Sequence, residues 1–331
     1  MATPRLHLVA DIGATHARFA LLDSHGRPDR VSVVATADHP GLGEAIAAFL
    51  ATRQLDSQDH QEMHAAIAVA GPITGDRVRL TNHPWTFSID AVRRQAGFAK
   101  LVVINDLEAV ALALPELPED AYEVIGTATP TADGPKAVLG IGTGFGAAYL
   151  VPAGRGEPHA WRAFASEAGH AALPPHDALE IELLSRLSQG PEPATIEHAL
   201  SGSGLVTLYR ALAEQAGDVS GQAPASPRAV VEAAGSGDDR LAARTLRIFS
   251  GLLGGVAGDL ALCYGARGGI YLTGGVLTRM GPLFDRAEFR VRFEARVSMR
   301  AYLSGIATCL IRAEYPALLG LARLLDHESR L

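Results

Sequence analysis

The chain has 331 residues, 48% of them hydrophobic, which suits about two folded domains and excludes an intrinsically disordered protein. Asp and Glu outnumber Lys and Arg by 36 to 29, and the basic residues form no run, so we expect no nucleic acid or membrane partner. No apolar stretch reaches the roughly 20 residues of a membrane span, and no signal-peptide core is present, which predicts a cytoplasmic protein.

In the first third of the chain, predicted strands alternate with predicted helices. Residues 6–23 predict a β-hairpin that turns at Gly13, with Asp11 at its mouth. The elements that follow are a helix at 41–54, a strand at 64–73, a helix after Ser88, a strand at 101–106 and a helix at 107–114. This alternation predicts a mostly parallel α/β sheet with one antiparallel hairpin.

A second hairpin is predicted at 137–151, and its similarity to the first indicates an internal duplication. The sequence then becomes more helical, with predicted helices at 178–188, 195–200, 204–214, 226–234 and 239–264, followed by a strand at 268–276. Within the longest helix, residues 252–264 are apolar and rich in glycine, which predicts burial. A last amphipathic helix, at 312–327, has Pro316 in its first turn, where proline is tolerated.

The predicted domain boundary lies near Pro115–Pro118, where a helix ends in LPELPED. We therefore expect a small α/β domain at 1–115 and a large α/β domain at 116–311. The C-terminal helix, at about 312–331, is expected to pack back on the small domain.

Glycine-rich turns follow the first strand of each predicted hairpin. Such turns let backbone N–H groups approach phosphate oxygens, although a single turn of this kind is more often an ordinary tight hairpin. Two of them, one led by Asp11 and one containing Gly142, Thr143 and Gly144, favour a nucleotide site. The Gly274–Gly275 pair, after a predicted strand, also suits a helix N-terminus near a nucleotide.

Polar residues stand where predicted strands and helices end. Asn105 and Asp106 lie at the carboxyl end of a strand, the edge at which open α/β sheets bind ligands. From position alone, Asp106 either caps the next helix or accepts a proton from a substrate hydroxyl. Glu167, His170 and Glu197 suit sugar hydroxyls, although each carboxylate taken singly is more often a solvated surface group.

The two cysteines, Cys263 and Cys309, are far apart in apolar surroundings. They predict two core residues and exclude a disulfide framework or a C-x-x-C metal pair.

Taken together, the motifs resemble the bacterial glucokinase family from residue 6 to about residue 323. The segments that carry the resemblance are VADIGATHARFALLD, AVAGPITGD, LTNHPWTFS, VVINDLEAVALALP, LGIGTGFGAAYLV, SEAGH, IEHALSGSGLVTLYRAL and YLTGGV. The resemblance implies the actin-like ATPase, ribonuclease H-like fold, in which two α/β domains flank a cleft. It also implies ATP-dependent phosphorylation of glucose at the 6-hydroxyl, giving glucose 6-phosphate and ADP. The related repressors and sugar kinases with a Cys-rich zinc site are a different group, since the cysteines they need are absent here.

The resemblance also implies roles for single residues. Asp106 would take the proton from the sugar 6-hydroxyl as the catalytic base, and the residues that would hold the sugar hydroxyls are Asn105, Glu167, His170 and Glu197. The residues expected around the phosphates are Asp11, Gly13, Ala14 and Thr15 in the first turn and Gly142, Thr143 and Gly144 in the second, with Gly274 and Gly275 by the adenosine. The implied cofactors are ATP and Mg²⁺, with Mg-ATP near Asp11 and no further protein metal ligand. The implied assembly is a homodimer.

Two motifs depart from the family pattern. The first turn has Ala14 and His16 where D-x-G-G-T-N-A-R is usual, and the sugar segment has Ser166 and Ala168 where G-E-G-G-H is usual. A methyl group at Ala14 would obstruct a phosphate if that position requires a positive φ. We therefore expect activity that is weak or altered in sugar preference.

Three alternatives stay open beside the glucose kinase. A sugar-binding regulatory protein with weak or no catalysis would explain the departures, and a kinase for mannose, fructose or an amino sugar would keep the fold. The retained Asp106 and the glycines of the second turn favour an active enzyme. An actin-like filament protein is possible on fold alone, but it would not need the sugar-binding segments.

Overall fold

The computed structural model of the chain describes residues 6–53, 62–81, 83–154, 161–188, 190–217 and 224–330. The chain divides into two units. The first unit comprises Met1–Leu117, Trp161–Ala165 and Ala313–Leu331, and the second comprises Pro118–Ala160 and Ser166–Arg312. Each unit contains a mixed sheet with helices packed against it, as the alternating pattern predicts.

The first unit is built on a five-stranded sheet in the order β3-β2-β1-β4-β7. Its strands are β1 (His7–Ile12), β2 (His16–Leu22), β3 (Pro28–Ala35), β4 (His64–Val69) and β7 (Lys100–Asn105). The predicted hairpin β1–β2 is confirmed as antiparallel, and β1, β4 and β7 run parallel. Strand β3 is an unpredicted addition at the sheet edge, where its half-exposed side chains show no strong alternation.

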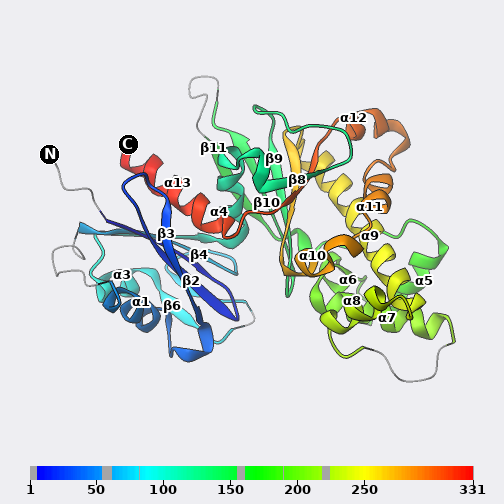
Figure 1. The fold of residues 1–331 in the computed structure, drawn as a ribbon, viewed down its shortest axis with the longest axis horizontal. Helices are drawn as coiled ribbons and strands as arrows, with labels where there is room; N and C mark the ends of the chain where they lie inside the picture. The colour runs from blue at the N-terminus through cyan, green and yellow to red at the C-terminus, as the bar shows by residue number, and fades with distance from the viewer. Residues whose placement is uncertain are drawn as a thin grey trace. The chain divides into compact units, whose positions relative to one another are not determined.

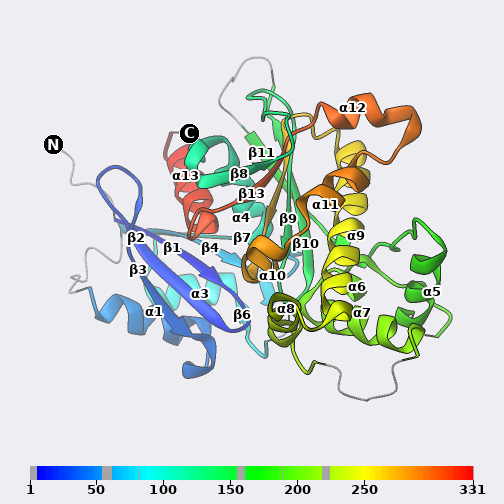
Figure 2. The same ribbon diagram turned by 45° about the vertical axis from the view of Figure 1, so that its right-hand side comes forward.

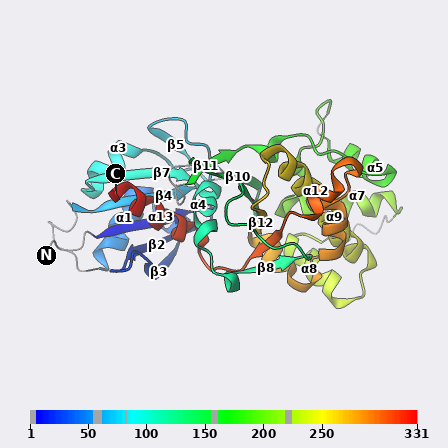
Figure 3. The same cartoon turned by 90° about the horizontal axis from the view of Figure 1, so that it is seen from above.

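Helices cover both faces of this sheet (Figures 1 and 3). Helices α1 (Leu42–Ala51) and α3 (Ile89–Ala96) lie on one face, and α4 (Asp106–Ala113) and α13 (Pro316–Arg330) lie on the other. The predicted cap of α3 is confirmed, because the Ser88 hydroxyl accepts the Ala91 N–H at 3.1 Å. Two short strands, β5 (Arg77–Arg79) and β6 (Thr86–Ser88), form a separate hairpin.

Helices α4 and α13 approach each other at a glycine. A Cβ added at Gly320 would overlap the backbone carbonyl oxygen of Ala109, so only glycine permits this helix separation. Helix α13 begins at Pro316, four residues after the predicted start at 312. Because α4 carries Asp106 at its N-terminus, the contact with α13 helps to fix that residue.

The second unit holds five consecutive strands of a six-stranded sheet in the order β11-β10-β9-β12-β13-β8. The strands are β8 (Tyr122–Ile125), β9 (Lys136–Ile141), β10 (Phe145–Pro152), β12 (Gly269–Thr273) and β13 (Thr308–Ile311), and β11 (Trp161–Ser166) is the remaining edge strand. The predicted second hairpin, β9–β10, is confirmed as antiparallel. Strands β8, β11 and β13 lie in segments where no strand is predicted.

The helices of the second unit are α5 (Ala178–Leu187), α6 (Ile196–Ala199), α7 (Gly202–Gln215), α8 (Pro227–Ser236), α9 (Arg240–Tyr264), α10 (Gly275–Met280), α11 (Arg286–Phe293) and α12 (Arg300–Ser304). The long helix α9 packs against α7, α8, α11 and α12 (Figure 2). Helix α9 is long and apolar enough to cross a membrane, but 61% of its most apolar window is buried inside the protein. A Cβ at Gly254 or Gly258 would overlap the backbone of α11, so its glycines permit close helix packing, and the predicted burial is confirmed. Cys309 is buried as expected, whereas Cys263, on the outer side of α9, is exposed.

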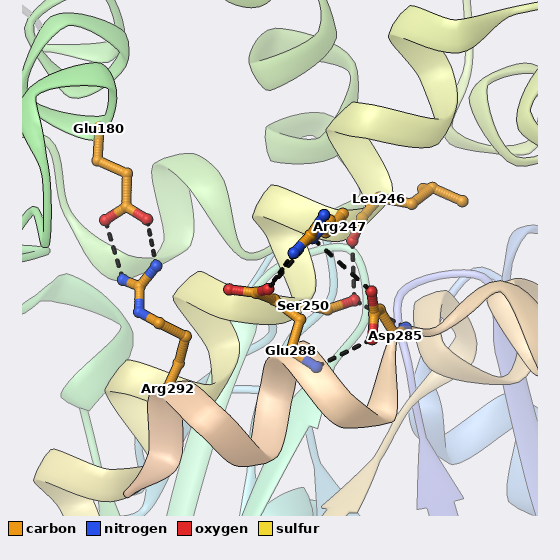
Figure 4. A network of polar contacts seen from close by, with 7 residues as sticks. All are labelled: Glu180, Leu246, Arg247, Ser250, Asp285, Glu288 and Arg292. Carbon is orange, nitrogen blue, oxygen red and sulfur yellow. Dashed lines mark hydrogen bonds and ion pairs between the residues drawn. The ribbon is translucent and has the colours of Figure 1, made fainter. Parts of the chain in front are cut away.

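A polar network fixes α9 and α11 to their neighbours (Figure 4). Glu180 on α5 is only 3% exposed, and both its carboxylate oxygens accept hydrogen bonds from Arg292 on α11, at 2.6 and 3.0 Å. The Ser250 hydroxyl on α9 accepts the backbone N–H of Asp285 at 3.1 Å. These pairs satisfy buried polar groups between helices, and removing Arg292 would leave the buried Glu180 carboxylate as an uncompensated charge.

Candidate active site

The first candidate residue, Asp11, lies near the end of β1. It stands opposite Arg18 in the β1–β2 register, and the Arg18 Nη1 donates a hydrogen bond to Asp11 Oδ2 at 3.1 Å. Burial raises the pKa of the Asp11 carboxyl, and the neighbouring Arg18 charge only partly offsets this rise. The hairpin therefore holds a largely buried carboxyl group near the carboxyl end of the central strand β1.

The turn after Asp11 is closed by its own backbone. Gly13 N–H donates to the His16 carbonyl at 3.0 Å, and the buried Thr36 hydroxyl donates to the Gly13 carbonyl at 3.2 Å. Within the described residues, the non-glycine residues with a positive φ do not include Ala14. The obstruction of a phosphate by Ala14 is expected only if this position requires a positive φ, and it does not.

The sequence leaves open whether Asp106 caps helix α4 or accepts a proton, and the structure gives the capping role to Asn105. Asn105 is the N-cap of α4: its Oδ1 accepts the N–H groups of Leu107 at 2.9 Å and Glu108 at 3.2 Å, and its Nδ2 donates to the Gly71 carbonyl at 3.3 Å. Asp106 is the first residue of the helix, so it is not the N-cap. Its Oδ1 accepts the Leu107 N–H at 2.8 Å, which orients the carboxylate.

The Asp106 carboxyl has an unusual proton affinity. Burial is the main cause that raises its pKa, to about 7, and the negative charge of Asp11 raises it further, while the hydrogen bond from Leu107 opposes the rise. A carboxylate with a pKa near neutrality can accept a proton from a substrate and release it again at physiological pH. This is the chemistry required of a general base.

In the second unit, the β9–β10 turn carries the second candidate loop. Glu197 Oε2 accepts the Phe145 N–H at 2.8 Å, and a Cβ added at Gly144 would overlap that same oxygen. A Cβ at Gly142 would meet nothing within 4 Å. Gly144 is thus needed to admit Glu197, whereas Gly142 borders open space.

The predicted sugar segment lies against the same hairpin. Glu167 precedes a single 3₁₀ turn (Ala168–His170) and His170 ends it, with 3.9 Å between the Glu167 carboxylate and His170 Nε2. Their side chains are 64% and 68% exposed, respectively. A Cβ at Gly169 would overlap the Phe145 carbonyl oxygen. Phe145 thus contacts Glu197 through its N–H and the Gly169 turn through its carbonyl, which brings three predicted sugar residues to one strand end.

Gly274 and Gly275 begin helix α10. Gly274 has a φ of 110°, and a Cβ there would overlap the backbone of Ile141 at the end of β9, whereas a Cβ at Gly275 would meet nothing within 4 Å. One residue near this point was not singled out from the sequence: Gly202 N–H donates to the Gly142 carbonyl at 2.9 Å. The signal for it is the small-residue run SGSG at the start of α7, where Ser201 is the N-cap.

Within the described ranges, no group of three or more His, Cys, Asp or Glu residues could hold a metal ion. A divalent ion held by the described residues would therefore need oxygens from a bound ligand besides a carboxylate such as Asp11.

A sequence model of the Glucokinase family matches residues 8–328 of the chain. A glucokinase of Aromatoleum aromaticum is 41% identical, and the match covers 97% of this chain and 94% of that protein. A relative in Paraburkholderia xenovorans, called bifunctional protein glk, is 42% identical over 97% of this chain. The match covers only 49% of that longer protein.

Solved structures give the same result. The glucokinase of an Antarctic psychrotroph has a TM-score of 0.84 at 33% identity and covers 98% of this chain and 100% of that chain. A glucokinase from Streptomyces griseus, solved with glucose and AMPPNP, has a TM-score of 0.61 at 21% identity, covers 98% of this chain and 99% of that chain, and is similar in fold. The match over nearly the whole length shows that this chain belongs to the bacterial glucokinase family.

Proposed function

We propose that the chain transfers the γ-phosphoryl group of ATP to the 6-hydroxyl of glucose, with Asp106 as the general base. The observation that carries the proposal is the Asp106 carboxylate, whose pKa is raised to about 7 while Asn105 caps the helix in its place. As the bond from the sugar O6 to the γ-phosphorus forms, the hydroxyl proton moves to Asp106. The bond between the γ-phosphorus and the bridging oxygen breaks, and ADP leaves with its electron pair.

The sugar contacts in this proposal are made by Asn105, Glu167, His170 and Glu197. Carboxylates accept hydrogen bonds from sugar hydroxyls, and amide and imidazole groups can both donate and accept. Two features support these roles: the exposure of Glu167 and His170, and the anchoring of Glu197 on the Phe145 N–H, which leaves its other carboxylate oxygen for a ligand. Asn105 keeps a second amide hydrogen beyond the one that it donates to Gly71.

The ATP contacts are assigned to Asp11 with Gly13, Ala14 and Thr15, to Gly142–Gly144, and to Gly274 and Gly275. The open space at Gly142 and Gly275 suits a ligand that approaches the backbone closely. Asp11 offers carboxylate oxygens, which Mg²⁺ prefers, and a cation bound there would relieve the repulsion by which Asp11 raises the pKa of Asp106. Bound with ATP, Mg²⁺ would neutralise the phosphate charge near Asp11.

Two of the departures from the family motif, Ala14 and Ser166, do not favour the regulatory alternative. Ala14 has no positive φ, and the Ser166 hydroxyl has defined partners, so neither substitution disrupts its turn. The cytoplasmic location and the homodimer stay predictions, and sedimentation analysis of the purified protein tests the latter.

A coupled assay of hexose-dependent ADP release tests the proposed reaction, with glucose, mannose, fructose and N-acetylglucosamine as acceptors and Asp106→Ala as the control. We expect the highest kcat/KM on glucose and its loss in the variant. A higher kcat/KM on another hexose would replace the glucose assignment. Glucose binding by calorimetry without any turnover would support the regulatory alternative.

A further inference from the structure

Ser166, one of the departures from the family pattern, is held by a side chain from a distant helix. Its Oγ accepts the Tyr264 hydroxyl at 2.8 Å and the Ala168 N–H at 3.2 Å. Ser166 ends β11, and Glu167 follows it directly. The two bonds therefore bracket Glu167, one fixing the residue before it and one fixing the residue after it.

Tyr264 is itself fixed in position. It is the last residue of α9, whose C-terminus is closed by Gly265 at a φ of 60° with its N–H directed to the Ala261 and Leu262 carbonyls. Its ring stacks on Tyr149 of β10, with 4.7 Å between ring centroids and 16° between planes. Burial raises the pKa of the Tyr264 hydroxyl, so this group stays protonated and remains a donor at physiological pH.

From this geometry we infer that Tyr264 is a positioning residue for the sugar segment: its hydrogen bond to Ser166 holds Glu167 in the orientation that receives glucose. The inference rests on the proposed sugar role of Glu167. The family pattern has glycine at position 166, which has no side chain to accept this bond. The hydrogen bond between Tyr264 and Ser166, which we call the latch, therefore requires a hydroxyl group at position 166.

The need for such a latch follows from the exposure of the segment. Glu167 is 64% exposed, and its φ of −94° and ψ of 35° lie outside regular helix and strand geometry. An irregular turn without such restraint has several accessible backbone conformations, each directing the Glu167 carboxylate differently, and glucose binding must overcome that freedom. Holding the backbone on both sides of Glu167 reduces this entropic loss, so the latch should act on glucose affinity and leave the chemical step unchanged.

The test is a double-mutant cycle with Tyr264→Phe, which keeps the stacked ring, and Ser166→Ala. We expect Tyr264→Phe to raise the KM for glucose by about three- to tenfold, the range set by one hydrogen bond, with kcat and the KM for ATP unchanged. Ser166→Ala also removes the bond from the Ala168 N–H, so it should raise this KM at least as much. The double variant should show no increase beyond that of Ser166→Ala, because Ser166→Ala already removes the bond to Tyr264. Tyr209→Phe is the matched control: it removes a tyrosine hydroxyl bonded at 3.0 Å to Asp239, the cap at the other end of α9, and should leave the KM for glucose unaltered.

Glu167→Gln, measured in parallel, separates this inference from the proposed function. If it raises the KM for glucose while Tyr264→Phe does not, the latch is overturned and the sugar contact stands. If it leaves the KM unchanged, the sugar role of Glu167 fails and the latch fails with it. If Tyr264→Phe lowers kcat, ATP affinity and melting temperature together, the hydrogen bond has a purely structural role and the inference is overturned. Additive effects of the two substitutions in the double-mutant cycle would also overturn it.

Discussion

Replacing Asp106 with Asn should strongly reduce turnover and stabilise the unliganded protein, because it removes a largely buried charge and keeps the shape of the side chain. The amide Oδ1 can still accept the Leu107 N–H, which lies 2.8 Å from Asp106 Oδ1. In the wild type, folding raises the pKa of this carboxyl from 3.8 to about 7. At about 1.36 kcal/mol per pKa unit, three units set an upper limit of about 4 kcal/mol on the destabilisation by the ionised form.

The size of the gain in stability depends on pH. Because the folded pKa is raised, the contribution of Asp106 to stability is fully present below about pH 4 and is lost as the pH rises through about 7. The amide of Asn does not titrate, so its contribution to stability does not depend on pH. We therefore expect the variant to be more stable by about 1 to 3 kcal/mol at about pH 8, with the difference shrinking as the pH falls toward 4.

Urea unfolding of both proteins without ligands, at several pH values between about 4 and 8, measures this difference. The matched control is Asp38→Asn, which neutralises an exposed carboxylate in the same unit and should show no comparable gain. In the same preparations, loss of the base should lower kcat by about 10² to 10⁴. A stability difference that does not change with pH, or a variant that is less stable at about pH 8, would refute the argument from burial.

Three further substitutions test the packing around the site. Gly144→Ala should displace Glu197 from the Phe145 N–H, raising the KM for glucose and lowering stability by about 1 kcal/mol in thermal melts. Gly320→Ala places a methyl group against the Ala109 carbonyl, so unfolding should show a loss of about 1 to 3 kcal/mol with reduced kcat, because α4 must shift. Ala14→Gly should leave turnover within about twofold in the coupled assay, since Ala14 has no positive φ.

The elements that the sequence predicts well are those with long apolar runs. Strand β4 is buried at nearly every position and β9 likewise, so their patterns are unambiguous. Strands β8 and β13 have four residues each, too few for periodicity to show, and they form because each pairs antiparallel with the other beside β12. Such strands depend on partners that lie far away in the chain.

At the candidate site, the sequence could not decide which of two adjacent residues caps the helix. Two adjacent residues, Asn105 and Asp106, are both good N-caps, and no sequence pattern decides between them. The decision comes from the extended backbone of Asn105, at a φ of −67° and a ψ of 149°, which turns its side chain toward the first N–H groups of α4. The raised pKa of Asp106 likewise depends on burial and on Asp11, a neighbour that only the parallel pairing of β1, β4 and β7 brings near.

The glycines of the second unit show why a motif does not reveal its own reason. The sequence argument gives every glycine of the turn one purpose, which is to let a phosphate approach the backbone. In the structure, Gly144 admits the Glu197 carboxylate and Gly274 admits the backbone of β9, while Gly142 and Gly275 border open space. Under the proposed function, the same short turn would serve a phosphate on its open side and hold the Glu197 carboxylate for the sugar through Gly144, so its glycines would be required for two different ligands.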